Sequence, residues 1–182
     1  MDRCPLHPKG GCGFRYVGTY ARKPSGTRVP RWHCPKGKQT FSLLADCLAA
    51  RFPDTLRDIE QVVDEVELLG SVEAAAHTMR GPDVLLPGAI RWVRRRLNAV
   101  RATLIPLIGL MPKRFSTCQP TLGSFRETLG VELVLPALRQ IVTDQLQAFP
   151  PPVGFSTRPK AVRWSKRRAP HSTGPDPPRK NR

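Results

Sequence analysis

Apolar residues recur every three or four positions through much of the middle of the chain, which is the spacing of a helix with one buried face. The clearest helix is predicted over residues 55–69. Its inward positions are Leu56, Ile59, Val63 and Val66. Thr55, followed three residues later by Asp58, is a capping-box pattern, and Gly70 is a helix-ending signal. Local chemistry therefore predicts both ends of this helix.

Five further helical segments are predicted. They cover residues 43–52, residues 72–79, residues 87–105, a region capped near residue 124, and residues 131–149. Pro53 ends the first, Ser71 caps the second, and Pro106 ends the third. Ser124 and Glu127 form a capping box for the fourth. Residues 43–149 are therefore expected to form a helical domain.

The first 42 residues have a different composition, rich in Cys, His, Gly, Pro and aromatic residues. Two runs with strand character, residues 14–20 and 28–34, flank the turn signal Lys23-Pro24-Ser25-Gly26. The pattern predicts a β-hairpin within a small module over residues 1–42.

Charge divides the 182-residue chain in a similar way. The net charge is +16, yet residues 43–149 carry twelve basic and twelve acidic side chains. Residues 1–42 and 150–182 each carry nine basic side chains and one acidic side chain. The last segment also holds eight prolines and little apolar surface, so we expect a disordered basic tail. The basic excess favours a polyanion partner, usually nucleic acid. A solvated basic surface without a specific partner is the alternative.

Residues 55–105 follow the order of a helix-turn-helix DNA-binding domain, with the third helix as the reading element. The candidate DNA-binding residues are Arg91, Arg94, Arg95, Arg96, Asn98 and Arg101. Arg91, Arg95 and Asn98 fall opposite the apolar stripe, and such side chains suit guanine and adenine edges. Two alternatives stay open: the arginines hold phosphates only, or they pair with acids on the helix over 55–69. Those acids are Glu60, Asp64, Glu65 and Glu67.

The N-terminal module holds a candidate zinc site. Its expected ligands are Cys4, His7, Cys12 and Cys34. The first two have the two-residue spacing of a ribbon knuckle, but the position three residues after Cys34 is Gly37, which offers no ligand. Cys12 supplies a fourth donor, and His33 is a weaker substitute because neighbours on a strand point to opposite faces. The alternative is a module that keeps these residues without zinc.

Several strings carry a family resemblance. They are Cys4-Pro5, Gly18-Thr19-Tyr20, Arg31-Trp32, Cys34-Pro35, Gln39-Thr40-Phe41-Ser42-Leu43-Leu44 and Ala89-Ile90-Arg91-Trp92-Val93-Arg94-Arg95-Arg96. Over residues 1–105 the chain resembles the zinc-ribbon and helix-turn-helix part of bacterial insertion-sequence transposases and their accessory proteins. The resemblance implies ligand positions at Cys4, His7, Cys34 and Gly37, the last of which departs from the pattern. It also implies binding to element ends or other duplex DNA.

The expected fold is therefore mainly α: a zinc-ribbon-like β-hairpin, a helix-turn-helix-type domain with a helical extension over 121–149, and a basic tail. We expect a non-enzymatic, transposon-associated protein that binds double-stranded DNA, with Zn²⁺ as cofactor and a transposase or other protein as a further partner. Three carboxylates in the arrangement of a transposase catalytic domain are missing. A protein-interaction adaptor, or an RNA-contacting protein, with a solubilising basic tail is the alternative. A decayed reading frame is the third.

Neither a membrane nor a small-molecule substrate is expected as a partner. The longest apolar stretch, residues 102–111, is about half the length that spans a bilayer. The N-terminal Met-Asp-Arg-Cys-Pro is followed by no apolar run typical of a secretory signal. We therefore expect a cytoplasmic protein.

Overall fold

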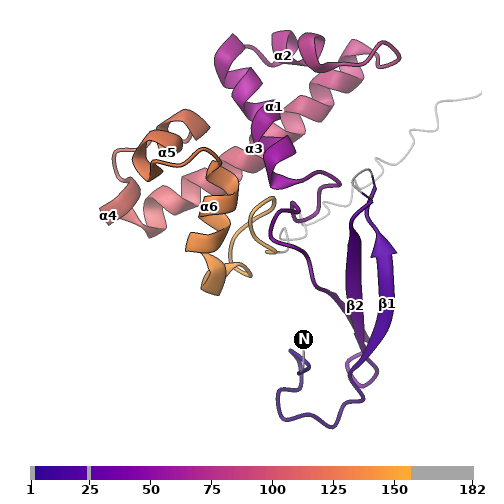
Figure 1. The fold of residues 1–182 in the computed structure, drawn as a ribbon. Helices are drawn as coiled ribbons and strands as arrows, with labels where there is room; N and C mark the ends of the chain where they lie inside the picture. The colour runs from indigo at the N-terminus through magenta and orange to yellow at the C-terminus, as the bar shows by residue number, and fades with distance from the viewer. Residues whose placement is uncertain (1–2, 24–25, 157–182) are drawn as a thin grey trace, which may run out of the picture.

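The computed structural model of this chain describes residues 3–23 and 26–156. A small antiparallel sheet projects from a body of helices (Figure 1). The strands are β1 (Arg15–Ala21), β2 (Arg28–Cys34) and β3 (Gln39–Ser42). The helices are α1 (Leu56–Leu69), α2 (Val72–Met79), α3 (Leu86–Leu110), α4 (Pro112–Phe115), α5 (Leu122–Leu129) and α6 (Val134–Ile141), followed by the 3₁₀ helix η1 (Thr143–Gln145). The prediction of a mainly helical chain with an N-terminal β-hairpin is confirmed.

The sheet has the strand order β1-β2-β3, and both pairs are antiparallel. The register of β1 against β2 shifts between Tyr16 and Gly18, where one extra residue forms a bulge. Gly18 has a φ of 110°, a conformation that a residue without a Cβ adopts at low cost. The Tyr16 and Trp32 rings meet edge to face across the two strands. β3 is an addition to the predicted hairpin.

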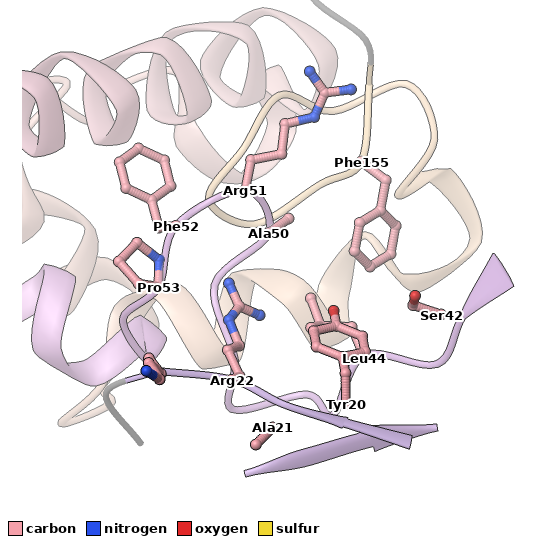
Figure 2. A pocket seen from close by; sticks show the side chains of 11 residues that line it. Tyr20, Ala21, Arg22, Ser42, Leu44, Ala50, Arg51, Phe52, Pro53 and Phe155 are labelled. Carbon is pink, nitrogen blue, oxygen red and sulfur yellow. The ribbon is translucent and has the colours of Figure 1, made fainter. Parts of the chain in front are cut away.

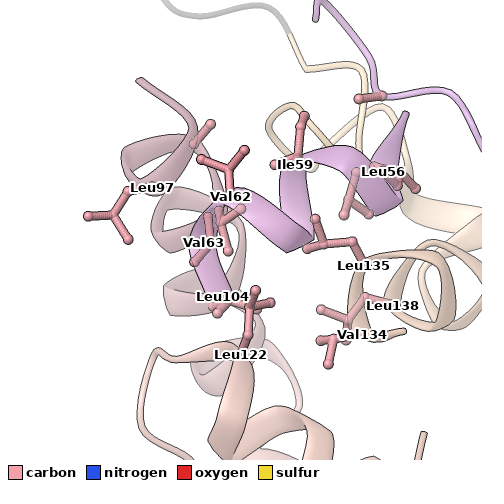
Figure 3. Close-up of a cluster of buried hydrophobic side chains, with 14 of the residues drawn as sticks. Leu56, Ile59, Val62, Val63, Leu97, Leu104, Leu122, Val134, Leu135 and Leu138 are labelled. Atoms are coloured by element: carbon pink, nitrogen blue, oxygen red, sulfur yellow. The ribbon is translucent and has the colours of Figure 1, made fainter. Parts of the chain in front are cut away.

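The α1–α2 corner forms as predicted. Thr55 and Asp58 make the reciprocal hydrogen bonds of a capping box, and Gly70 ends α1 in the left-handed region. Ser71 then caps α2 by accepting a hydrogen bond from the amide of Ala74. Figure 3 shows the core against which α1 packs, with Leu97 and Leu104 of α3, Leu122 of α5, and Val134, Leu135 and Leu138 of α6.

α3 is longer than predicted, because Pro106 lies inside the helix and does not end it. A proline removes one backbone hydrogen bond and crowds the preceding turn. Leu104 and Leu107, on either side of it, are fully buried in the core. Helical bonding resumes beyond the proline, since the Met111 amide donates to the Leu107 carbonyl. Burial of this turn therefore outweighs the lost hydrogen bond.

The prediction of a helix over residues 43–52 is wrong, since the structure shows turns there. The later apolar residues of this segment are nevertheless buried, Leu48 and Ala49 completely, whereas Leu43 and Cys47 are exposed. Backbone hydrogen bonds tie it to the start of α1: the Ala49 amide donates to the Asp54 carbonyl, and the Leu56 amide donates to the Cys47 carbonyl. A ten-residue helix is marginal by itself, and these tertiary contacts bury Leu48 and Ala49 without one.

Two helix boundaries near the C-terminus differ from prediction. α5 is capped by Thr121, whose hydroxyl accepts from the Ser124 amide, so it begins before the predicted capping box. The helix predicted over residues 131–149 ends at Ile141. There the Thr143 hydroxyl donates to the carbonyls of Arg139 and Gln140, which would otherwise accept from later helical amides.

The segment 150–156, predicted as the start of the tail, packs on the helical body. Val153 is fully buried, and the Pro152 carbonyl accepts from the Ala50 amide. The Arg139 guanidinium donates to the Pro152 and Val153 carbonyls and also to the carbonyls of Asp46 and Leu48. One buried arginine thus holds two irregular segments together. The rest of the predicted tail, residues 157–182, lies outside the described residues.

Candidate functional site

The predicted metal ligands come from three short pieces of chain that meet at the end of the sheet. Cys4 and His7 lie on one turn, in which the His7 amide donates to the Cys4 carbonyl at 3.1 Å. Cys12 follows a loop with two glycines, Gly10 and Gly11, in left-handed conformations. Cys34 is the last residue of β2. The β-hairpin therefore brings Cys34 back to the N-terminal turn.

The four side chains form a compact donor cluster that could hold a metal ion. Their ligand atoms all lie within 4.8 Å of one another. His7 Nδ1 is 3.6 Å from Cys4 Sγ and 3.5 Å from Cys34 Sγ. Zn–S and Zn–N bonds in a tetrahedral site place ligand atoms roughly 3.5–3.8 Å apart. The donor set and its spacing therefore fit one zinc ion. His33 does not belong to this group of clustered donors, and its Nδ1 lies 3.3 Å from the Thr40 hydroxyl instead.

Gly37 occupies the position of the missing knuckle ligand. Its amide lies 3.2 Å from Cys34 Sγ and donates to it, as an amide does toward a knuckle thiolate. A Cβ at this position would lie 2.6 Å from the Leu6 side chain and 3.3 Å from Cys34 Sγ. The glycine thus lets the backbone approach the sulfur closely, while Cys12 completes the group of four.

The thiols of the cluster differ in acidity. Burial acts to raise the pKa of Cys4, but hydrogen bonds with His7, with the backbone of Leu6 and with the other two thiols lower it to about 6. Burial, together with interactions with Cys4 and Cys34, raises the pKa of Cys12. Metal binds the thiolate form of cysteine. The lowered pKa of Cys4 therefore favours its metal-binding form near neutral pH.

The second group of predicted residues lies on α3, and most of it faces solvent. Five of the six candidate DNA-binding residues are exposed: Arg91, Arg94, Arg95, Asn98 and Arg101. In contrast, Arg96 is 3% exposed and pairs with Asp54 at 2.5 Å. Its guanidinium also covers the Trp92 ring at 3.7 Å from the centroid. Arg96 follows the buried Val93 by three residues, so helical spacing could have placed it beside the apolar stripe. Its burial and its ion pair favour a structural role for Arg96.

The acids of α1 do not neutralise the α3 arginines, so that alternative is not supported. The Glu60 carboxylate accepts hydrogen bonds from the first two amides of α6 at 2.7 and 3.0 Å, and it also pairs with Arg126. Glu67 accepts from the first two amides of α5 at 2.8 and 3.1 Å. Arg126 also binds Asp64. Glu60 and Glu67 therefore cap the N-termini of α6 and α5, and sequence spacing did not indicate such distant partners.

The exposed face of α3 consequently carries little counter-charge. Among the described residues, its one ion pair is between Arg94 and Glu73, both exposed, at 3.9 Å. α1, α2 and α3 pack against one another, and residues 80–85 connect α2 to α3. In the described part of the chain, no helix is long and apolar enough to cross a membrane. Comparisons with family models, curated proteins and solved structures find no match for this chain.

Proposed function

We propose that this chain is a non-enzymatic protein that binds double-stranded DNA with the exposed face of α3. One observation carries the proposal: Arg91, Arg95, Asn98 and Arg101 lie exposed on one helix, and among the described residues no carboxylate pairs with them. Cationic side chains gain most from phosphates when no acid competes for them. An α-helix also fits the major groove of B-DNA.

The type of side chain supports base contacts as well as phosphate contacts. Arg91, Arg95 and Asn98 recur at helical spacing and occupy adjacent turns. Arginine binds the guanine edge and asparagine the adenine edge through paired hydrogen bonds. α1 and α2 support this helix in the order of a helix-turn-helix domain, although the connection of residues 80–85 is longer than the usual turn. An accessory or regulatory role beside a transposase is the form of this function that the resemblance implies.

The N-terminal module is proposed to be a structural zinc ribbon. Four protein donors would close a tetrahedral site and leave no position for a substrate. The apolar cluster of this module is small, with three of the cysteines packed beside Phe14 and Phe41. So small a core needs an additional constraint, which a bound metal ion provides.

Binding of a labelled duplex at several salt concentrations tests the proposal. We expect affinity to fall steeply with salt, because bound arginines release counterions from DNA. Charge reversal of Arg91 and Arg95 to Glu should abolish binding without unfolding the protein. Arg114, an exposed arginine on α4, gives the matched control Arg114→Glu. Absence of binding at low salt, or equal loss in the control, would contradict the proposal.

A protein-interaction adaptor is the second candidate, and an apolar hollow favours it. The hollow lies between α2 and α3, has a volume of about 410 Å³, and includes Met79, Val84 and Trp92 in its wall. All three side chains are substantially exposed. The same charge reversals distinguish the two candidates. An adaptor that binds its protein partner through this hollow would keep that binding when Arg91 and Arg95 are changed to Glu.

A further inference from the structure

We infer that Arg51 and Arg95 form a phosphate-binding site that holds the sugar–phosphate backbone of a nucleic acid strand beside α3. The inference rests on the proposed function, assigns Arg95 to the backbone and leaves base contacts to Arg91 and Asn98, and adds a contact by Arg51 outside the α3 face. Arg51 belongs to the turns that connect the sheet to α1, a segment that is predicted as a helix and in which the sequence indicates no candidate site residue.

The two arginines share a hollow of about 320 Å³ between α3 and the segments on either side of it. The other described residues in its wall are Phe52, Ala99, Ala102, Pro150 and Pro151, none of them acidic. Both arginines are exposed, and neither pairs with a carboxylate in the part of the chain that the structure describes. Two arginines without a carboxylate partner in the wall of one hollow suit an anion with several oxygens.

Arg95 is held in position by an aromatic ring. Its guanidinium carbon lies 5.0 Å from the centroid of Phe52, and the Phe52 ring is itself buried. The same ring lies under Arg96, which is fixed by Asp54. A cation held over an aromatic ring loses less side-chain freedom when it binds an anion. The site is therefore partly organised before a ligand arrives.

Arg51 has a backbone conformation that its residue type disfavours. Its φ is 60°, in the left-handed region that favours glycine or asparagine. The neighbouring backbone is fixed by the bonds of the Ala49 and Ala50 amides to Asp54 and Pro152. Arg51 is exposed, so burial in the core does not account for the residue, and we assign its role to the charge that it adds at the hollow. Disfavoured backbone conformations of this kind gather at binding sites.

A second hollow continues the site toward the sheet. It has a volume of about 600 Å³ and shares Arg51 and Phe52 with the first, so the two adjoin. Figure 2 shows Phe155 and Tyr20 on one side of this hollow and Phe52 and Pro53 on the other. Lys23, next to the hairpin turn, also contributes to its wall. The two hollows together form a basic path from α3 to the hairpin, along which successive phosphates of one strand would lie.

The test measures duplex binding as a function of salt for four variants. Arg51→Asn removes the charge but keeps a residue that tolerates the left-handed conformation, and Arg51→Lys keeps the charge. Arg114→Gln is the control, since Arg114 is an exposed arginine, like Arg51, and lines neither hollow. Arg91→Gln reports on the α3 face. Thermal unfolding of each variant verifies the fold.

We expect Arg51→Asn to weaken binding roughly five- to tenfold at 0.1 M salt, equally for all sequences, and to reduce the slope of log K against log salt by about 1. Arg51→Lys and Arg114→Gln should retain the wild-type slope. If Arg51→Asn and Arg114→Gln both match the wild type while Arg91→Gln weakens binding, the phosphate site is overturned and the α3 interface stands.

Two other outcomes also count against the site. A loss of affinity in Arg51→Asn without a change of slope overturns it, because the lost contact would not involve a phosphate. If the wild-type protein binds no duplex even at low salt, the result contradicts both the proposed function and the phosphate-binding site. Titration with inorganic phosphate alone distinguishes the source of the anion. Tight binding of it that is lost in Arg51→Asn would overturn the assignment to nucleic acid.

Discussion

The Glu60 carboxylate on α1 lies 3.0 Å from the Arg126 guanidinium on α5, and Glu60 is only 1% exposed. The same carboxylate accepts hydrogen bonds from the first amides of α6. One acidic side chain therefore joins three helices. Its burial is tolerated because a cation and two helix amides satisfy its oxygens.

The Glu60→Gln variant should be strongly destabilised. An amide has one accepting oxygen, so one buried α6 amide loses its acceptor, and Arg126 keeps Asp64 but loses the charge of Glu60. We expect the free energy of unfolding, measured with denaturant, to fall by about 3 kcal/mol. The exposed Glu127 gives the control Glu127→Gln, with a change within about 0.5 kcal/mol. Equal values for the two variants would contradict the capping role of Glu60.

Arg96 and Arg91 should respond in opposite ways to the same substitution. Arg96→Gln leaves Asp54 without its ion pair and removes the cation from the Trp92 ring, so stability should fall by about 3 kcal/mol. Arg91→Gln removes an exposed charge and should change stability by less than about 0.5 kcal/mol while weakening DNA binding. Thermal unfolding and duplex binding, measured on both variants, separate the two roles. A destabilised Arg91→Gln protein would refute this division.

The purified protein should contain one zinc ion per chain. Substitution of Cys4, Cys12 or Cys34 by Ser should remove it, because each supplies one of four clustered donors. Cys47 lies outside the cluster and is exposed, so Cys47→Ser is the matched control. Metal content by atomic emission is the measurement. Retention of zinc in Cys12→Ser would exclude Cys12 as the fourth ligand.

Gly37→Cys should restore zinc binding to the Cys12→Ser protein. Position 37 is adjacent to the cluster, since a Cβ there lies 3.3 Å from Cys34 Sγ and 3.7 Å from the His7 ring. The close contact, at 2.6 Å, is with a terminal methyl group of Leu6, which is half-exposed and able to move. Gly37→Ala in the same background is the control without a donor. Metal content equal to that of the control would show that the knuckle position cannot reach the ion.

The elements predicted correctly are those determined by nearby residues. The ends of α1 follow from Thr55, Asp58 and Gly70, and the hairpin from its turn and strand composition. The donor cluster was predictable in the same way, because few Cys and His residues are available in the module. Its closure by Cys12 depends on a glycine-rich loop, whose path only the structure gives.

The elements predicted incorrectly depend on partners distant in sequence. Leu48 is buried without a helix because Arg139, far along the chain, donates a hydrogen bond to the Leu48 carbonyl. Pro106 is accepted inside α3 because its neighbours face the core. The caps supplied by Glu60 and Glu67 join residues more than fifty positions apart. Periodicity contains no information about such pairs.

Arg51→Gly should make the protein more stable and a weaker DNA binder. Glycine adopts a φ of 60° at little cost, so removal of the disfavoured conformation should raise the free energy of unfolding by up to about 1 kcal/mol. The same change at Arg101, exposed within α3, should instead lower it by about 1 kcal/mol, since glycine weakens a helix interior. Denaturant unfolding and duplex binding of both variants are the measurements. A gain in stability together with a loss of affinity identifies Arg51 as a residue kept for binding at a cost in folding. If Arg51→Gly were less stable than the wild type, the side chain would have a structural role that its exposure does not indicate.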